Sequence, residues 1–170
     1  MLLLRLKPYE PSDAPCILSW CKGEKAFYQW TAGMLGPYPL SEKGFNAVEA
    51  LTPFTALDPS GPAGFFTLRD PGGDGREQRF GFVIVAPEKR GQGYGKEMLA
   101  LGLRYAFETL RAARASLGVF ENNPAAIACY KGAGFKLLPM ERPETYCILG
   151  ENWPCLELGM EAEAWRKQSW

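Results

Sequence analysis

Residues 86–96 read Ala-Pro-Glu-Lys-Arg-Gly-Gln-Gly-Tyr-Gly-Lys, and they follow an apolar run, Phe82-Val83-Ile84-Val85, with the composition of a central strand. After them, an amphipathic pattern predicts a helix from Gly93 to about Arg111. Backbone N–H groups at such a strand-to-helix junction can converge on an oxyanion, helped by the helix dipole. The stretch therefore predicts a phosphate-binding loop inside an α/β fold. Its glycines are Gly91, Gly93 and Gly95.

The charges and the glycine spacing of this loop narrow the choice of ligand. Arg90 and Lys96 bracket the glycines with positive charge, which suits a pyrophosphate. A Walker A loop is excluded, because it needs glycine where the chain has Arg90 and Ser or Thr where it has Glu97. The G-x-G-x-G spacing in mid-chain also matches a dinucleotide fingerprint only weakly. From the glycines alone, an ordinary glycine-rich turn stays open as an alternative.

Periodicity and turn residues predict the elements around the loop. The predicted order is strand, two or three helices, three strands, helix, strand, helix and two strands, which is typical of an α/β fold with a mixed sheet. We expect one domain over residues 1–170. Ser12 or Asp13 is expected to cap the first helix. The predicted ranges are strands at 2–7, 54–57, 64–68, 79–85, 115–120, 135–138 and 153–160, and helices after 13, at 24–30, from 41 to about 51, from 93 to about 111, and at 124–131.

The composition bounds the possible partners. Nineteen basic and nineteen acidic residues cancel among 170, so no overall positive field favours nucleic acid or an anionic membrane as a partner. Arg5 and Lys7 interrupt the opening Met1–Leu4 before a signal sequence can develop, and no later stretch has the length of a membrane span. We expect a cytoplasmic protein.

Histidine and cysteine usage restricts the chemistry. The chain has no histidine, which excludes an imidazole general base, a Ser-His or Cys-His dyad and most catalytic zinc sites. Its five cysteines are odd in number and lack metal-ligand spacing, so we expect free thiols and no metal. Catalysis must use carboxylates, phenols, thiols, amines or backbone groups.

Two motifs together resemble the GNAT superfamily of N-acetyltransferases. The loop Arg90–Gly95 is similar to the family's acetyl-CoA loop, in which Arg or Gln is followed by two residues, Gly, one residue, and Gly or Ala. Downstream, Asn123–Phe135 is similar to a second family motif, with Asn, Ala three residues later, Tyr four residues after that, and then Gly-Phe. The pair is more specific than either motif alone, and it covers residues 80–135.

The resemblance implies a single-domain GNAT-like α/β fold with a mixed, mostly antiparallel central sheet flanked by helices. It also implies transfer of an acetyl group from acetyl-CoA to a primary amine, by direct attack in a ternary complex and without a metal. The acceptor would be an amine-bearing small molecule or a protein N-terminus, and family members often form homodimers. Two alternatives are a non-catalytic acyl-CoA sensor, which would keep the loop without turnover, and an ATP- or NAD-binding enzyme.

The resemblance also implies roles for individual residues. Tyr130 would be the general acid, because a phenol with a pKa of ~10 suits protonation of the leaving thiolate. Its alternative is an aromatic residue of the core. Asn123 either bonds the cofactor arm or caps the following helix. Glu77, which precedes the central strand, is the candidate general base. The residues expected to bind acetyl-CoA are Val83, Ile84, Val85, Arg90, Gly91, Gln92, Gly93, Tyr94, Gly95, Lys96, Asn123 and Ala126.

The acceptor site is expected among the N-terminal helices, where four aromatic residues gather: Trp20, Phe27, Tyr28 and Trp30. Aromatic residues at helical spacing are more often part of a core. Tyr28 and Trp30 are the candidate acceptor-binding residues, and the sequence does not identify the amine. An enzyme is favoured over a sensor because Tyr130 accompanies the loop.

Overall fold

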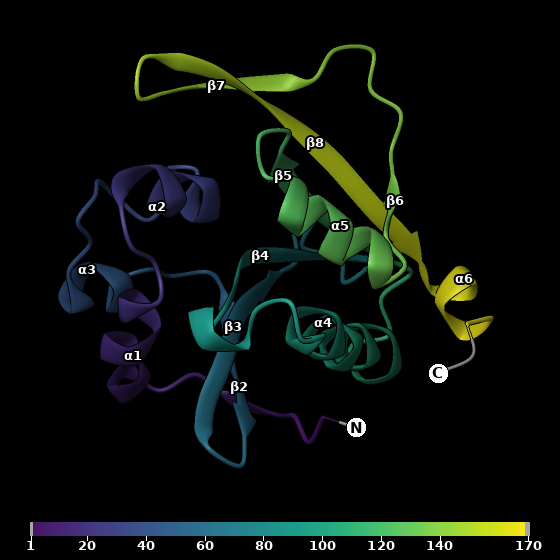
Figure 1. Ribbon diagram of the computed structural model, residues 1–170. Helices are drawn as coiled ribbons and strands as arrows, with labels where there is room; N and C mark the ends of the chain where they lie inside the picture. The colour runs from purple at the N-terminus through teal and green to yellow at the C-terminus, as the bar shows by residue number, and fades with distance from the viewer. Residues whose placement is uncertain (1, 169–170) are drawn as a thin grey trace.

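The computed structural model describes residues 2–168, and the strands within them form one mixed sheet (Figure 1). The strand order is β1-β2-β3-β4-β5-β8-β6, and β7 also pairs with β8. Among the strands of residues 2–168, only β4 and β5 pair in parallel, so the mixed, mostly antiparallel sheet confirms the predicted fold class. The strands are β1 Arg5–Pro8, β2 Thr52–Asp58, β3 Gly61–Arg69, β4 Glu77–Val85, β5 Arg114–Phe120, β6 Lys136–Leu137, β7 Glu144–Ile148 and β8 Glu151–Glu161.

Helices cover the two faces of the sheet unequally. In Figure 1, α1 to α3 gather on one side and α4 and α5 on the other. Phe66 packs in the larger core with α4, whereas Phe65 packs in a smaller core with α1 and α3, because successive strand residues point to opposite faces. The helices are α1 Ala14–Ser19, α2 Glu24–Thr31, α3 Glu42–Asn46, α4 Tyr94–Arg104, α5 Pro124–Gly132 and α6 Ala162–Arg166.

Helix α4 lies unusually close to the sheet at Gly102. A Cβ atom there would lie 2.6 Å from Cε1 of Phe80 and 2.9 Å from Cζ of Phe66. Only glycine therefore lets the helix approach these buried rings without displacing them. This close approach fixes α4, and with it the loop that precedes α4, against β3 and β4.

Several predicted boundaries differ from the structure. The helix expected from residue 41 to about 51 ends at Asn46, although Ser41 caps it as expected by accepting from the N–H of Gly44 at 3.0 Å. The helix expected to reach Arg111 is α-helical to Arg104 and continues as a π-helical turn over Tyr105–Thr109. Strand β7 and helix α6 were not predicted. The Asp13 side chain does not cap α1 and instead accepts from Lys7, Thr55 and the N–H of Glu10, the last as part of a capping box on the 3-10 turn Pro11–Asp13.

Two expectations from composition can be compared with residues 2–168. All five cysteines are free thiols, as predicted. Within this part of the chain, no helix combines the length and the apolar character needed to cross a membrane.

Candidate functional site

The parallel pair β4–β5 is joined at one end only. Its register covers three residue pairs, from Glu77↔Arg114 to Arg79↔Ser116, and beyond them the strands separate. At the same level β4 bulges away from β3, since Thr67 is opposite Gly81 while Phe65 is opposite Ile84. Phe82 takes a left-handed conformation within this bulge, with φ of 49°. The separation and the bulge together open the middle of the sheet.

A cavity of about 510 Å³ fills this opening, and we call it the splay cavity. Its volume is in the range of small-molecule and cofactor sites. Both strands, the loop before α4, helix α5, helix α2 and the segment between α1 and α2 contribute to its walls. The lining residues are Trp20, Cys21, Lys22, Ala26, Gln29, Trp30, Phe80, Gly81, Phe82, Val83, Ile84, Val85, Pro87, Arg90, Gly91, Gly95, Leu117, Gly118, Val119, Asn123, Ala125, Ala126, Cys129 and Tyr130.

Glycine is needed at the three loop positions for different structural reasons. Gly91 and Gly93 are left-handed, with φ of 72° and 87°, which favours glycine. Gly95 has ordinary helical geometry, but a Cβ there would lie 2.7 Å from the Sγ atom of Cys129 on α5. The first two glycines therefore shape the loop at the N-terminus of α4, and the third lets α4 and α5 pack together beside the cavity.

Arg90 fastens the loop to its surroundings. Its Nε donates to the carbonyl of Val85 at 3.0 Å, and its Nη2 donates to the carbonyl of Trp20 at 3.1 Å. The side chain thus ties the end of β4 to the end of α1, with the guanidinium at the cavity wall. Arg90 therefore orients the loop as well as adding positive charge.

Tyr130 lies in the wall of the splay cavity and is 8% exposed. It also belongs to the larger core, so the two roles considered for it, general acid and core aromatic, are compatible in space. Burial raises the pKa of its phenol, which therefore stays protonated at neutral pH. A protonated phenol beside the cavity can donate a proton to a leaving group.

Residues 17–135 match the model of the Acetyltransferase (GNAT) family. The chain belongs to the GNAT acetyltransferase family. It is accordingly an N-acetyltransferase that takes its acetyl group from acetyl-CoA and transfers it to an amine.

Two similar solved structures share the fold of this GNAT acetyltransferase. A spermidine N-acetyltransferase from Vibrio cholerae, in complex with CoA and spermine, has a TM-score of 0.80 at 20% identity, over 96% of this chain and 98% of that chain. A dodecameric structure of spermidine N-acetyltransferase from the same organism has a TM-score of 0.72 at 21% identity, over 97% and 98% of the two chains. At these identities the likeness concerns the fold alone.

The acetyltransferase brings most of the residues expected to bind acetyl-CoA to one place. The candidate acceptor residue Trp30 lines the same cavity, and its Nε1 donates to the carbonyl of Phe82 at 2.8 Å. Asn123 lines it too, while its side chain caps α5 by accepting from the N–H of Ala126 at 3.3 Å. The other expected residues in the wall are Val83, Ile84, Val85, Arg90, Gly91, Gly95 and Ala126.

Other expected residues lie outside the wall of the splay cavity. The Gln92 side chain folds back and donates to the carbonyl of Glu88 at 2.7 Å. The Tyr94 hydroxyl donates to Asp58 at 2.9 Å, in a cluster where Lys89 also pairs with Asp58. Both side chains therefore stabilise the loop through contacts outside the cavity. Gly93, Lys96 and Tyr28 are also outside the wall.

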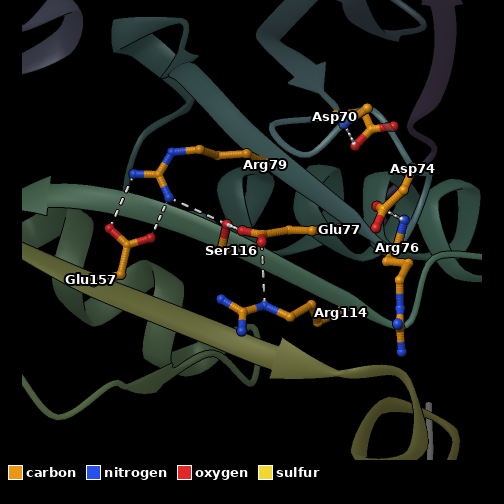
Figure 2. Close-up of polar contacts among 9 residues, drawn as sticks. Asp70, Asp74, Arg76, Glu77, Arg79, Arg114, Ser116 and Glu157 are labelled. Atoms are coloured by element: carbon orange, nitrogen blue, oxygen red, sulfur yellow. Dashed lines mark hydrogen bonds and ion pairs between the residues drawn. The ribbon is translucent and has the colours of Figure 1, made fainter.

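Glu77, the candidate base, lies where β4 and β5 are still paired. Its carboxylate accepts from the hydroxyl of Ser116 and lies 3.5 Å from Nε of Arg114 (Figure 2). Beside it, the Arg79 guanidinium binds Glu157 across β5. The structure therefore does not bring Glu77 into the splay cavity, because the cavity opens only beyond Arg79.

Sequence reasoning missed Gly81, Phe82 and Gly118, which line the splay cavity. Gly118 carried a usable signal, since an isolated glycine inside a strand often marks a close approach of another group. A Cβ at Gly118 would lie 3.0 Å from Nη2 of Arg79 and 3.2 Å from Sγ of Cys155. The bulge at Phe82 has no comparable signal, because its register depends on the partner strand.

Proposed function

We propose that this acetyltransferase acetylates the primary amine of a small molecule by direct attack on the thioester of acetyl-CoA in a ternary complex. One observation carries the proposal: the separated strands, the glycine loop and Tyr130 all border a single cavity. A loop built only for packing would not need to open onto the same space as a protonated phenol.

The chain fits acetyl-CoA through its backbone and its loop. Ile84 and Val85 still pair with β3, but β5 has separated from β4 beyond Arg79, so the backbone groups of Val83–Val85 that face this open edge are available to pair with the pantetheine arm. The Val85 carbonyl also accepts from Arg90. The left-handed turns at Gly91 and Gly93 place successive N–H groups at the start of α4, where a pyrophosphate is stabilised. Arg90 and Lys96 add positive charge at this end.

We propose the following roles during transfer. The bound acetyl thioester supplies the electrophilic carbonyl, and backbone N–H groups at the bulge hold its oxygen as negative charge develops. When the C–S bond breaks, the Tyr130 phenol gives its proton to the leaving sulfur and later regains one from solvent. Among the described residues, the wall of the splay cavity contains no Asp or Glu side chain. We therefore assign removal of the amine proton to water rather than to Glu77.

Thermal unfolding with different ligands tests the donor site. Acetyl-CoA and CoA at one hundred times their dissociation constants should each stabilise the fold by about 2.7 kcal/mol. In a chain of this size, that corresponds to an increase in melting temperature of roughly 5–10 °C. ATP and NAD at the same concentrations should not change the melting temperature. A shift with ATP or NAD but not with CoA would contradict the proposed donor.

Two matched glycine variants sharpen this measurement. Gly93→Asp places a carboxylate at the proposed pyrophosphate site, and we expect it to abolish the CoA-dependent shift. Gly73→Asp is the control, because Gly73 is also left-handed, with φ of 71° and open space around it, but lies in the turn between β3 and β4. Both variants carry similar backbone strain, so only an effect on ligand binding separates them. Equal CoA shifts in the two variants would count against the loop.

Self-association is a second part of the proposal. The edge formed by β6, β7 and their connections exposes three apolar side chains, Leu137, Met140 and Leu149, which are 41–51% exposed. A similar protein from Vibrio cholerae is dodecameric. We therefore expect a homo-oligomer rather than specifically the homodimer. Light scattering should give a molar mass at least twice that of the chain, and a monomeric mass would refute this expectation.

A further inference from the structure

Two further cavities continue from the opening in the sheet. The first, about 420 Å³, extends over the sheet face that carries Thr67 and Arg79; we call it the face cavity. It shares Trp30, Gly81 and Phe82 with the splay cavity. The second, about 290 Å³, is the aromatic pocket, which shares Thr67 and Phe82 with the face cavity. An acceptor whose amine reaches the splay can therefore place its remaining atoms in this connected space.

The aromatic pocket is walled by rings that already pack against one another. Phe45 lies 5.6 Å from Tyr9 and 5.4 Å from Phe65, measured between ring centroids. Tyr9 meets Phe65 edge-on at 5.6 Å. The Tyr9 hydroxyl is occupied, since it donates to the side-chain oxygen of Asn46. The pocket thus presents a preformed apolar surface of the kind that binds an aromatic or aliphatic group.

Thr67 adds a hydroxyl without a hydrogen-bond partner among the described residues, where the aromatic pocket meets the face cavity. Its side chain is only 3% exposed, and within residues 2–168 its hydroxyl has no hydrogen-bond partner. A buried hydroxyl without a partner is unfavourable, so such groups usually serve a bound water or ligand. Thr67 pairs with Gly81 across the strands and borders both cavities. It is therefore placed to bond a polar group near the reacting end of an acceptor.

The charges around this space do not suit a polycation. Among the described residues, the charged side chains lining the face cavity are Glu49, Arg69 and Arg79, and the aromatic pocket contains none. Arg79 is paired with Glu157. A polyamine would thus meet two guanidinium groups and one lining carboxylate, although its several ammonium groups each need a negative partner when desolvated.

We infer that the acceptor is a primary amine carried on an apolar, ring-sized body, which the aromatic pocket holds while the Thr67 hydroxyl bonds the amine end. The inference rests on the proposed function and adds the substrate class to it. It separates this chain from the polyamine substrates named for the similar Vibrio cholerae structures. Thr67 acts here as a positioning residue and takes no part in proton transfer.

Calorimetric titration of the CoA-saturated protein tests the substrate class without requiring turnover. We expect 2-phenylethylamine to bind at least tenfold more tightly than spermidine. Equal binding, or tighter binding of spermidine, would overturn the inference. CoA is titrated into the free protein before the amines are added. A protein that does not bind CoA in that step would refute the donor site and not the substrate class, so the two failures are distinguishable. Steady-state kcat/KM for the two amines should follow the same order.

A pair of tryptophan variants tests the pocket itself. Val48 borders both the face cavity and the aromatic pocket and is 36% exposed, so Val48→Trp should fill the space and weaken 2-phenylethylamine binding at least tenfold. Leu110→Trp is the control, because Leu110 is 38% exposed and lines none of these cavities. CoA affinity should be unchanged in both. Unaltered amine binding by Val48→Trp would refute the pocket.

Two substitutions of Thr67 separate binding from folding. Thr67→Val removes the unpaired hydroxyl and should raise the melting temperature of the free protein while weakening 2-phenylethylamine about fivefold, the value of one neutral hydrogen bond. Thr67→Ser keeps the hydroxyl and should restore the affinity. A purely structural residue would change stability and affinity in the same direction. If Thr67→Val binds the amine as well as wild type, Thr67 has no positioning role.

Discussion

Replacing Tyr130 by Phe should lower kcat by a factor of about 10²–10⁴, the usual contribution of a general acid. The ring still fills the same part of the core, so the free energy of unfolding and the affinity for acetyl-CoA should change little. The loss would arise because the sulfur must leave as an unprotonated thiolate. Steady-state kinetics with acetyl-CoA and 2-phenylethylamine measure kcat, and a CoA titration measures the affinity.

Tyr105→Phe is the matched control for this experiment. Tyr105 packs edge-on against Phe54, with ring centroids 5.1 Å apart, and is outside the wall of the splay cavity. Its substitution should leave kcat within a factor of two. Because burial raises the pKa of Tyr130, wild-type kcat should show no loss from phenol ionisation below about pH 10. If Tyr130→Phe retains a third or more of wild-type kcat, Tyr130 is only a core residue.

Replacing Asp13 by Ala should lower the free energy of unfolding by about 3 kcal/mol at pH 7. The Asp13 carboxylate accepts from Nζ of Lys7 at 2.8 Å, from the buried Thr55 hydroxyl at 2.9 Å and from the N–H of Glu10 at 3.0 Å. Its removal leaves the Thr55 hydroxyl without this hydrogen-bond partner and breaks the bonds that link the start of α1 to β1 and β2. Urea unfolding at pH 7 measures the loss. Glu10→Gln is the control, because Glu10 also pairs with Lys7 but is 67% exposed, and should cost under about 1 kcal/mol.

The contribution of Asp13 should also depend on pH. Burial alone would raise the pKa of this carboxyl, but the hydrogen bonds from Lys7, Glu10 and Thr55 outweigh it and lower the pKa below the ordinary value of an aspartate. A lowered pKa in the folded state stabilises the fold above the unfolded-state value, and this stabilisation disappears as the pH falls through the folded-state value. The difference between wild type and Asp13→Ala should therefore shrink below about pH 4. A difference that is equal at pH 7 and pH 3 would contradict the assigned hydrogen bonds.

The sequence predicted the donor half of the molecule better than the rest. The loop at Gly91–Gly95 and the helix carrying Tyr130 could be predicted because their signals are local: glycine at left-handed positions, and a capping Asn123 ahead of proline. The strand at Phe82–Val85 was equally clear from its β-branched and aromatic residues. These elements meet at the splay cavity, which the motifs implied but did not locate.

The remaining features depend on contacts between distant parts of the chain. Strand β7 is short and exists because it pairs with β8 across the turn at Leu149 and Gly150. The Tyr94 side chain lies outside the cavity wall because its hydroxyl donates a hydrogen bond to Asp58, at the end of β2. Glu77 precedes the central strand in sequence, but the three-pair register of β4 and β5 places it at the closed end of the sheet. Such effects of register and long-range pairing cannot be predicted from the residue pattern of one segment.

The splay cavity and the aromatic pocket are lined by different parts of the sequence. Among the described residues, those that line the splay cavity lie mainly between Phe80 and Tyr130, and those that line the aromatic pocket lie between Tyr9 and Phe82. Of these residues only Phe82, at the bulge, lines all three cavities. Under the proposed function, substitutions in α3 and the β2–β3 hairpin would change the preferred amine without altering the residues assigned to the thioester. A family with this layout can diversify its substrates while keeping a single chemistry.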